Sequence, residues 1–214
     1  SAGLQWDEIS NPYDHPGNDW YQASRNQDPL KYLLEKPVIS EPGGRFLYNG
    51  GYTLMLSYLI EKKTGQSVLE YAHDHFFAPL GIADYYWDDV ECGLTDTDGG
   101  LYLRPRDMAK IGYLYLNDGN WNGVQLVSPA WVEASVQVHM DNQGMPDYGF
   151  QWWCGNFRYW DKEVFTYVAS GHGGQKIFVF PTFDMVVVTT HQVFDNPFGE
   201  LNNLAILMDY ILPS

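Results

Sequence analysis

The residue pattern of this chain changes once, near Pro146, from helical periodicity to strand-like runs. Before Pro146, apolar residues recur at three- and four-residue intervals, which is the spacing that lets a helix bury one face. After it, residues 176–180 and 185–191 are rich in β-branched side chains, and residues 181–184 form a turn between them. The order of elements therefore predicts an α+β fold with helices first, then an antiparallel sheet, then a terminal helix.

Capping signals set the expected ends of the helices. Gly65 follows an apolar face that begins at Tyr52, and Ser67 with Glu70 forms a capping box. Pro105 and Pro129 are good first-turn residues. Residues 1–47 are predicted to be mostly ordered loop with one short helix. The expected helices span residues 28–34, 52–64, 67–77, 105–116, 128–138 and 201–211, and a further short strand is expected at 148–154.

These elements predict one continuous domain with two lobes. Residues 1–146 form the mainly helical lobe, and residues 147–214 supply the antiparallel strands and C-terminal helix of the sheet lobe. A chain of 214 residues with 45% hydrophobic residues is long enough to bury a sizeable core.

Charge excludes some partners. The formal net charge is −15, and such a surface repels phosphate backbones and anionic membranes, so we expect no nucleic-acid partner. No apolar run is long enough to span a bilayer, and no signal peptide is present, although the natural amino terminus is expected to lie upstream. Aromatic residues make up 16% of the chain, which suits either aromatic-lined clefts or a carbohydrate-binding module.

Metal and disulfide chemistry find little support. Cys92 and Cys154 have no metal-ligand spacing, and whether they pair is left open. His73 and His75 stand two positions apart on a predicted helix, so they face different sides and are expected on the surface. We expect no metal and no cofactor.

The chain shows no nucleophile motif of a serine hydrolase. No serine is followed by lysine three positions later, the spacing that puts both side chains one helical turn apart. The Gly-x-Ser-x-Gly pattern is absent too, because Ser170 follows Val168 and Ala169.

Two glycine-containing segments nevertheless stand out. Residues 42–52, PGGRFLYNGGY, come directly before a predicted helix, and residues 170–176, SGHGGQK, come directly before a predicted strand. The first, with its helix ending in Thr-Gly-Gln-Ser, resembles the tyrosine motif of class C-like serine β-lactamases and penicillin-binding proteins. The second resembles their third motif, Lys-Thr-Gly or His-x-Gly. Other resembling segments are residues 1–6, 77–82, 106–112 and 118–121, and the esterase and 6-aminohexanoate-dimer hydrolase branch is the most similar.

The resemblance implies a role for each motif residue. Tyr48 is the proton-transfer group beside the nucleophile, His172 is a site residue, and the backbone N–H of Gln175 is half of an oxyanion hole, its side chain being incidental. Gly50, Gly173 and Gly174 are expected to line the substrate site.

Two positions depart from the family pattern. Glycine at position 50 removes the amide of the frequent Tyr-x-Asn motif, which weakens the case for β-lactams. His172 in place of lysine holds a substrate carboxylate less strongly, because a neutral imidazole carries no charge.

The resemblance implies a β-lactamase/transpeptidase-like serine hydrolase with a site between two lobes, acting on a small-molecule ester, amide or β-lactam carbonyl. A periplasmic or secreted location is favoured. The Ser-x-x-Lys segment is expected upstream of residue 1, so this chain alone is expected to be inactive. An amino-terminal chain fragment, or a second copy in a homodimer, is expected to cover the exposed sheet.

The alternative is a non-catalytic carbohydrate- or peptidoglycan-binding protein on a β-lactamase-like scaffold. Its ligand would lie against aromatic side chains, which could equally well belong to the core. The candidates are Trp20, Tyr21, Trp152, Trp153 and Trp160.

Overall fold

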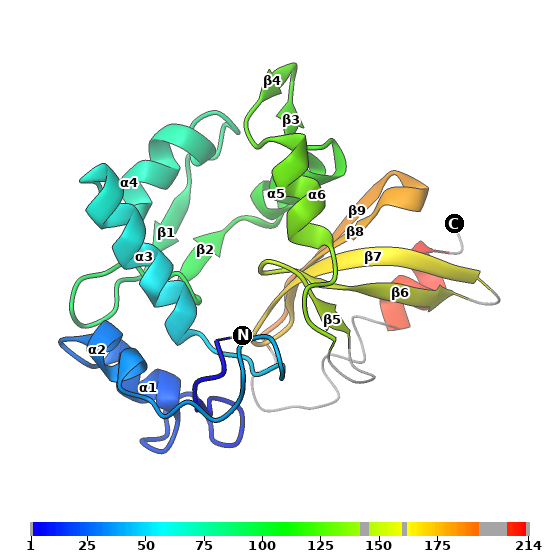
Figure 1. Ribbon diagram of the computed structural model, residues 1–214. Helices are drawn as coiled ribbons and strands as arrows, with labels where there is room; N and C mark the ends of the chain where they lie inside the picture. The colour runs from blue at the N-terminus through cyan, green and yellow to red at the C-terminus, as the bar shows by residue number, and fades with distance from the viewer. Residues whose placement is uncertain (1, 142–145, 160–161, 193–204, 213–214) are drawn as a thin grey trace. The chain divides into compact units, whose positions relative to one another are not determined.

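The computed structural model describes residues 2–141, 146–159, 162–192 and 205–212 (Figure 1). The chain forms two compact units, Ser1–Leu103 and Arg104–Ser214. The sequence had suggested a boundary at 146/147. The units divide earlier because the helices that follow Arg104 pack on the sheet rather than with the other helices.

The first unit is mainly helical. Its elements are α1 (Asp19–Ser24), α2 (Pro29–Leu34), α3 (Gly51–Thr64), α4 (Val68–Ala72), the π-helical turn η1 (His73–Phe77), and the strand pair β1 (Tyr85–Trp87) and β2 (Leu101–Leu103).

Local capping explains where these helices begin and end. The Ser67–Glu70 capping box at the start of α4 is confirmed, and Gly65 ends α3 in the left-handed conformation with φ 74°. Asp28 caps α2 through the backbone N–H of Lys31. Helix α1 had not been predicted, although Asn18 caps it by accepting from the N–H groups of Trp20 and Tyr21.

The core of the first unit lies where α1, α2 and α3 meet the N-terminal segment. Its buried members are Trp6, Trp20, Ala23, Leu33, Leu54 and Val90. Trp20 therefore packs in the core, which is one of the two environments considered equally for the aromatic residues. Since Trp6 belongs to this cluster, the segment that follows it is anchored to the helices.

The second unit is built on a five-stranded antiparallel sheet with strand order β5-β6-β7-β8-β9. The strands are β5 (Asp147–Tyr148), β6 (Trp153–Tyr159), β7 (Lys162–Gly171), β8 (Gln175–Phe180) and β9 (Met185–Thr189). The remaining elements are α5 (Pro105–Leu116), the hairpin β3 (Asn120–Trp121) and β4 (Val124–Gln125), α6 (Pro129–Val136), η2 (Pro181–Phe183) and the π-helical turn η3 (Leu207–Ile211).

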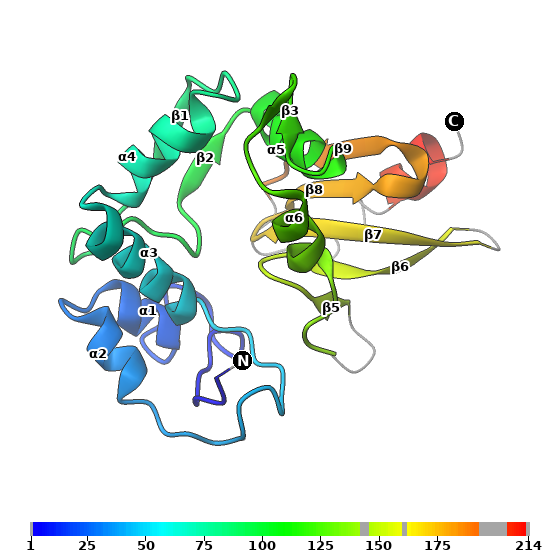
Figure 2. The same ribbon diagram turned by 45° about the horizontal axis from the view of Figure 1, so that its top comes forward.

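The two faces of this sheet carry separate cores, because successive side chains of a strand point to opposite faces. Ile177 and Val179 of β8 pack with α5 residues such as Met108. Phe178 and Phe180 point the other way and pack with Leu207. Figures 1 and 2 show α5 on one side of the sheet and the C-terminal helical turn on the other.

Close packing of α5 on the sheet depends on a small residue. A Cβ built on Gly112 would lie 2.6 Å from Cγ1 of Val186 and 2.8 Å from Cγ2 of Ile177. Any larger residue would therefore separate the helix from β8 and β9.

The strand predictions were partly wrong. The expected strand at 148–154 is divided between β5 and β6, and β7 had not been predicted despite its Val-Phe-Thr-Tyr-Val run at 164–168. The strands near 176–180 and 185–191 are confirmed as β8 and β9. Of the expected C-terminal helix, residues 201–204 lie outside the described residues. Among the described helices, none combines the length and the apolar character needed to cross a membrane.

Candidate active site

Tyr48 lies in the loop that leads into α3. Its side chain is half-buried, and the next two residues, Asn49 and Gly50, are buried. Gly50 is the N-cap of α3, and its carbonyl oxygen accepts from the N–H of Thr53 at 3.0 Å and from Thr53 Oγ1 at 2.6 Å. The loop that carries Tyr48 is thus tied directly to the first turn of the helix.

The buried carboxylate of Glu8 holds the same loop from the other side. Glu8 is 2% exposed, and its Oε2 accepts from the backbone N–H of Gly50 at 2.7 Å. Oε2 also accepts from Nε1 of Trp6, and Oε1 accepts from the Tyr13 hydroxyl at 3.4 Å. Burial raises the pKa of Glu8, while the bonds from Gly50, Trp6 and Tyr13 favour its charged form.

A second carboxyl group, that of Asp98, lies against the Cα of Gly50. A Cβ built on Gly50 would lie 2.5 Å from Cγ of Asp98 and 2.7 Å from each of its oxygens. Burial raises the pKa of Asp98 to about 8, and the negative charges of Glu8 and Asp96 act in the same direction. Burial and these two charges therefore favour the protonated, neutral form of Asp98.

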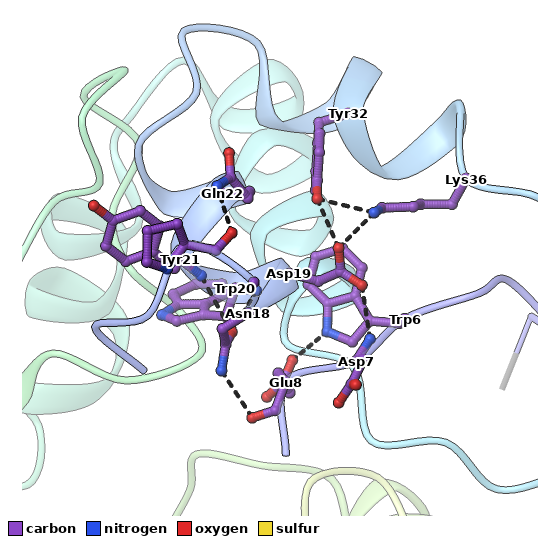
Figure 3. Close-up of polar contacts among 12 residues, drawn as sticks. Trp6, Asp7, Glu8, Asn18, Asp19, Trp20, Tyr21, Gln22, Tyr32 and Lys36 are labelled. Atoms are coloured by element: carbon purple, nitrogen blue, oxygen red, sulfur yellow. Dashed lines mark hydrogen bonds and ion pairs between the residues drawn. The ribbon is translucent and has the colours of Figure 1, made fainter. Parts of the chain in front are cut away.

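A network of polar contacts fixes the segment that carries Glu8 (Figure 3). The Asp19 carboxylate accepts from the hydroxyl of Tyr32 at 2.6 Å and from Nζ of Lys36 at 2.5 Å. Its other oxygen accepts from the N–H of Asp7 at 2.7 Å, and Asn18 donates to the Glu8 carbonyl at 3.1 Å. The position of Glu8 is thereby coupled to α1 and α2.

In the second unit, His172, Gly173 and Gly174 form the turn between β7 and β8. Gly171 pairs with Gln175, so the turn contains only these three residues. Gly173 and Gly174 have φ of 80° and 94°, which a side chain disfavours, and both are buried, whereas His172 is exposed. The two glycines thus meet a backbone requirement of the turn.

Gln175 has a structural contact that the sequence did not indicate. Its side-chain Nε2 donates to the carbonyl of His191 and, at 3.5 Å, to the carbonyl of Gly173. Thr189 Oγ1 donates to the carbonyl of Gly174 at 3.4 Å. The turn is therefore tied to β9 and the residues just after it, so the Gln175 side chain is not incidental to its shape.

A serine and a lysine meet next to this turn. Nζ of Lys176 on β8 donates to Oγ of Ser170 on β7 at 2.7 Å. Sequence motifs could not find this pair, since it is created by the register that places Ser170 opposite Lys176. A base that activates a serine must accept the hydroxyl proton. In this pair the lysine is the donor and the serine oxygen the acceptor, so the lysine does not act as a base.

Other candidates for chemistry receive no role. Cys92 and Cys154 are free, and burial raises the pKa of the Cys154 thiol to about 11, which makes it a poor nucleophile. His73 and His75 are exposed, as predicted, and His73 Nδ1 lies 2.6 Å from the Tyr85 hydroxyl. Within the part of the chain that the structure describes, no His, Cys, Asp and Glu side chains gather in a metal-binding group.

The aromatic side chains considered for a cleft fall into different environments. Trp152 is 5% exposed and packs with Tyr167 in the core of the second unit. Trp153 is half-buried, and Trp160 lies outside the described residues. Trp20 and Trp152 are therefore core residues and cannot present an open face to a ligand.

The expected site residues form two groups. Tyr48 and Gly50 share one loop of the first unit, and His172, Gly173, Gly174 and Gln175 share one turn of the second. Sequence reasoning missed Glu8 and Asp98. Neither carries a signal in the sequence, because the burial of Glu8 beside Trp6 and of Asp98 beside Gly50 is visible only in the fold.

Comparison with known proteins identifies the family of the chain. The Beta-lactamase family profile matches residues 1–208. A 6-aminohexanoate-dimer hydrolase of Paenarthrobacter ureafaciens is 27% identical over 197 residues, covering 85% of this chain and 48% of that protein. The chain spans about half the length of the curated relatives it matches, 48% and 55% for two of them.

Solved structures show the same fold. A Bacillus anthracis protein provisionally assigned as a 6-aminohexanoate-dimer hydrolase superposes with a TM-score of 0.74 at 24% identity, covering 96% of this chain and 56% of that one. A penicillin-binding protein from Bacillus halodurans gives a TM-score of 0.68 at 19% identity, with 96% and 69% coverage. The fold is thus β-lactamase/transpeptidase-like, and because the family profile spans residues 1–208, this chain belongs to the β-lactamase family.

Proposed function

We propose that the protein containing this chain is a serine hydrolase that cleaves an ester or amide bond in a small molecule by acyl transfer. The observation that carries the proposal is the family match over residues 1–208, together with the Tyr48 loop and the His172–Gly174 turn. β-Lactams remain within the reaction class, although Gly50 lacks the side-chain amide of the common motif.

The reaction divides into two acyl transfers. A serine outside these 214 residues attacks the carbonyl carbon, and its proton passes to Tyr48, which a neighbouring lysine cation activates. The proton then goes to the departing alcohol or amine, which leaves an acyl-serine ester. Water attacks this ester in the second transfer, releases the acid and restores the serine.

The β7–β8 turn is proposed to stabilise the negative charge that develops on the carbonyl oxygen. The backbone N–H of Gln175 would donate to this oxygen, as one half of an oxyanion hole. Support comes from Gly173 and Gly174, which have no side chain to keep a substrate away, and from the bond between the Gln175 side chain and the His191 carbonyl. His172 is exposed at the tip of the turn, where it would contact the substrate.

The substrate class follows from the relatives only as a proposal. A hydrolase of 6-aminohexanoate dimers acts on an amide, and that relative is similar over 85% of this chain. Short amide oligomers and simple esters are therefore the first substrates to try.

The sheet offers a place for additional chain. β9 stands at the end of the strand order, so among the described residues it pairs on one side only. We propose that an amino-terminal segment, or a second copy, covers this region, since native proteins rarely leave long strand edges open.

The direct test is labelling of the intact protein by a fluorophosphonate, which reacts with activated serines. We expect the wild type to be labelled and to show a burst with p-nitrophenyl acetate, and both signals to collapse in Tyr48→Phe. Tyr58→Phe is a matched control, because Tyr58 lies on α3 and is 37% exposed. A folded wild-type protein that takes up no label would overturn the proposal.

A further inference from the structure

Gly50 stands between two carboxyl groups that come from distant parts of the first unit. Glu8 Oε2 lies 2.7 Å from its backbone nitrogen, and Asp98 fills the space where a side chain at position 50 would begin. We infer that Glu8 and Asp98 form a positioning pair for Tyr48, in which Glu8 carries the charge and Asp98 carries the proton. The expected effect on kcat rests on the proposed function. The expected effect on the structure of the Tyr48 loop does not.

The two carboxyl groups have different surroundings, which decide where the proton resides. Glu8 accepts from three donors, namely Gly50, Trp6 and Tyr13, and hydrogen bonds of this kind stabilise a carboxylate. Asp98 is acted on by burial and by the carboxylates of Glu8 and Asp96, and all three influences favour its neutral form. One proton is thus enough to relieve the repulsion between the two groups.

The other titratable groups nearby do not reverse this order. Tyr13 and Asp19 also act on Glu8, and Tyr13 feels both Glu8 and Asp98. Asp96 accepts from the backbone N–H groups of Asp98 at 3.0 Å and Gly99 at 2.9 Å. Among the described residues, none of these neighbours is a cation, and the nearby Lys36 ammonium is paired with the Asp19 carboxylate at 2.5 Å.

The loop that carries Tyr48 depends on this arrangement. Both polar atoms of the Asn49 amide are buried without a hydrogen-bond partner among the described residues, so that side chain does not hold the loop. Gly50 instead links Glu8, through its N–H, to Thr53 in the first turn of α3, through its carbonyl. If Asp98 ionises, two buried anions face each other across Gly50, and the loop must shift to separate them.

A structural test needs no assumption about activity. Labelling Asn with ¹³C at the carbonyl and Gly with ¹⁵N selects Asn–Gly peptide bonds, and this chain contains two, Asn49–Gly50 and Asn122–Gly123. In the intact protein we expect the Gly50 amide resonance to titrate with a midpoint near pH 8, the value for Asp98. The Gly123 amide, in the turn between β3 and β4 of the second unit, serves as the internal reference.

Two variants identify the group that titrates. Asp98→Asn keeps the shape of the side chain but cannot ionise, so the Gly50 amide should lose its titration. Asp89→Asn removes an exposed carboxylate from the same loop, and the titration should remain. The inference would be overturned by a Gly50 amide resonance that keeps its chemical shift between pH 6.5 and 9.5. It would also be overturned by a resonance that still titrates in Asp98→Asn.

The kinetic test separates positioning from mere structure. For an essential proton with a pKa near 8, kcat falls about tenfold from pH 7 to pH 9, and the fall should be in kcat rather than in KM. Asp98→Asn should lose most of this pH dependence, while Asp89→Asn should keep it. If the amide titrates but the ratio of rates at pH 7 and pH 9 is the same in Asp98→Asn, the pair exists and does not position Tyr48. If the protein shows no hydrolase activity but the amide titrates, only the proposed function fails.

Discussion

Glycine is required at position 50 for a different reason than at the other glycine positions of the candidate site. Its φ is −65°, a value open to any residue, so no backbone freedom is needed there. Space is the constraint, because Asp98 occupies the position of the first side-chain atom. The departure from Tyr-x-Asn thus has a steric partner 48 positions later in the chain, which a contiguous motif cannot reveal.

Gly50→Ala should accordingly destabilise the protein by about 1–3 kcal/mol, the usual cost of overpacking a filled site. Asp98→Ala in the same chain should restore much of the loss, because it removes the carboxyl group that the new methyl group meets. Urea denaturation of the two single variants and the double variant measures the coupling. Independent, additive losses would show that the two side chains do not compete for one space.

Asp98 also makes stability depend on pH. Its folded pKa of about 8 lies above the ordinary value of 3.8, so between these values the folded state holds a proton that the unfolded state has released. The free energy of unfolding should therefore fall as pH rises from about 4 to about 8, by at most about 1.4 kcal/mol per pH unit for one proton.

Asp98→Asn should reduce this slope without abolishing it, because Glu8 and Asp96 also have raised pKa values and contribute with the same sign. Denaturation series at pH 5, 6, 7 and 8 provide the comparison. Equal slopes for the wild type and Asp98→Asn would mean that Asp98 is ionised throughout this range.

At the scale of elements, the β7–β8 turn places a glycine with positive φ directly before the N–H group proposed for the oxyanion hole. Gly174 has φ 94°, so Gly174→Ala should cost about 1–2 kcal/mol and displace the neighbouring N–H of Gln175. We expect kcat to fall more than the melting temperature alone explains, since the donor no longer points at the same place. Gly155→Ala in β6 is the control, because nothing lies within 4 Å of its added Cβ. Equal effects of the two substitutions would remove the turn from the mechanism.

How well each element could be predicted depended on the range of the interactions that form it. Gly65, Ser67 and Asp28 set helix ends through contacts within a few residues, and those ends were predicted. β7 was missed, and residues 148–154 were read as one strand, because a strand is defined by a partner elsewhere in the chain. The helices α5 and α6 pack with the sheet, although the sequence had grouped them with the other helices, because helical periodicity does not tell which surface a helix covers.

The candidate site follows the same rule. The Tyr48 loop and the His172–Gly174 turn are contiguous in sequence, so motif resemblance could pick them out. The bond between Glu8 and Gly50 joins residues 42 positions apart, and the Ser170–Lys176 contact depends on strand register. Contacts of this kind become visible only once the fold is known.

For the whole molecule, the main question is whether these 214 residues contain a nucleophile. Ser57 and Ser135 are buried at 0% and 1% exposure, so a reagent cannot reach them. Ser170 is exposed, but Lys176 donates to its oxygen instead of accepting its proton. Within the described part of the chain, the arrangement around these three serines therefore does not provide an activated hydroxyl.

The 214-residue chain by itself should thus take up no more fluorophosphonate than the same chain after denaturation, and should not turn over p-nitrophenyl acetate. Circular dichroism first shows whether the isolated chain is folded, and the intact protein under identical conditions is the positive control. Ser170→Ala tests the exposed serine that contacts Lys176. If the isolated chain is labelled and Ser170→Ala abolishes the label, Ser170 and Lys176 are a nucleophilic pair, and the reaction does not need a serine from outside these residues. If the isolated chain stays unlabelled while the intact protein reacts, the nucleophile lies outside them, and Tyr48 and the β7–β8 turn act on a serine that another part of the protein supplies.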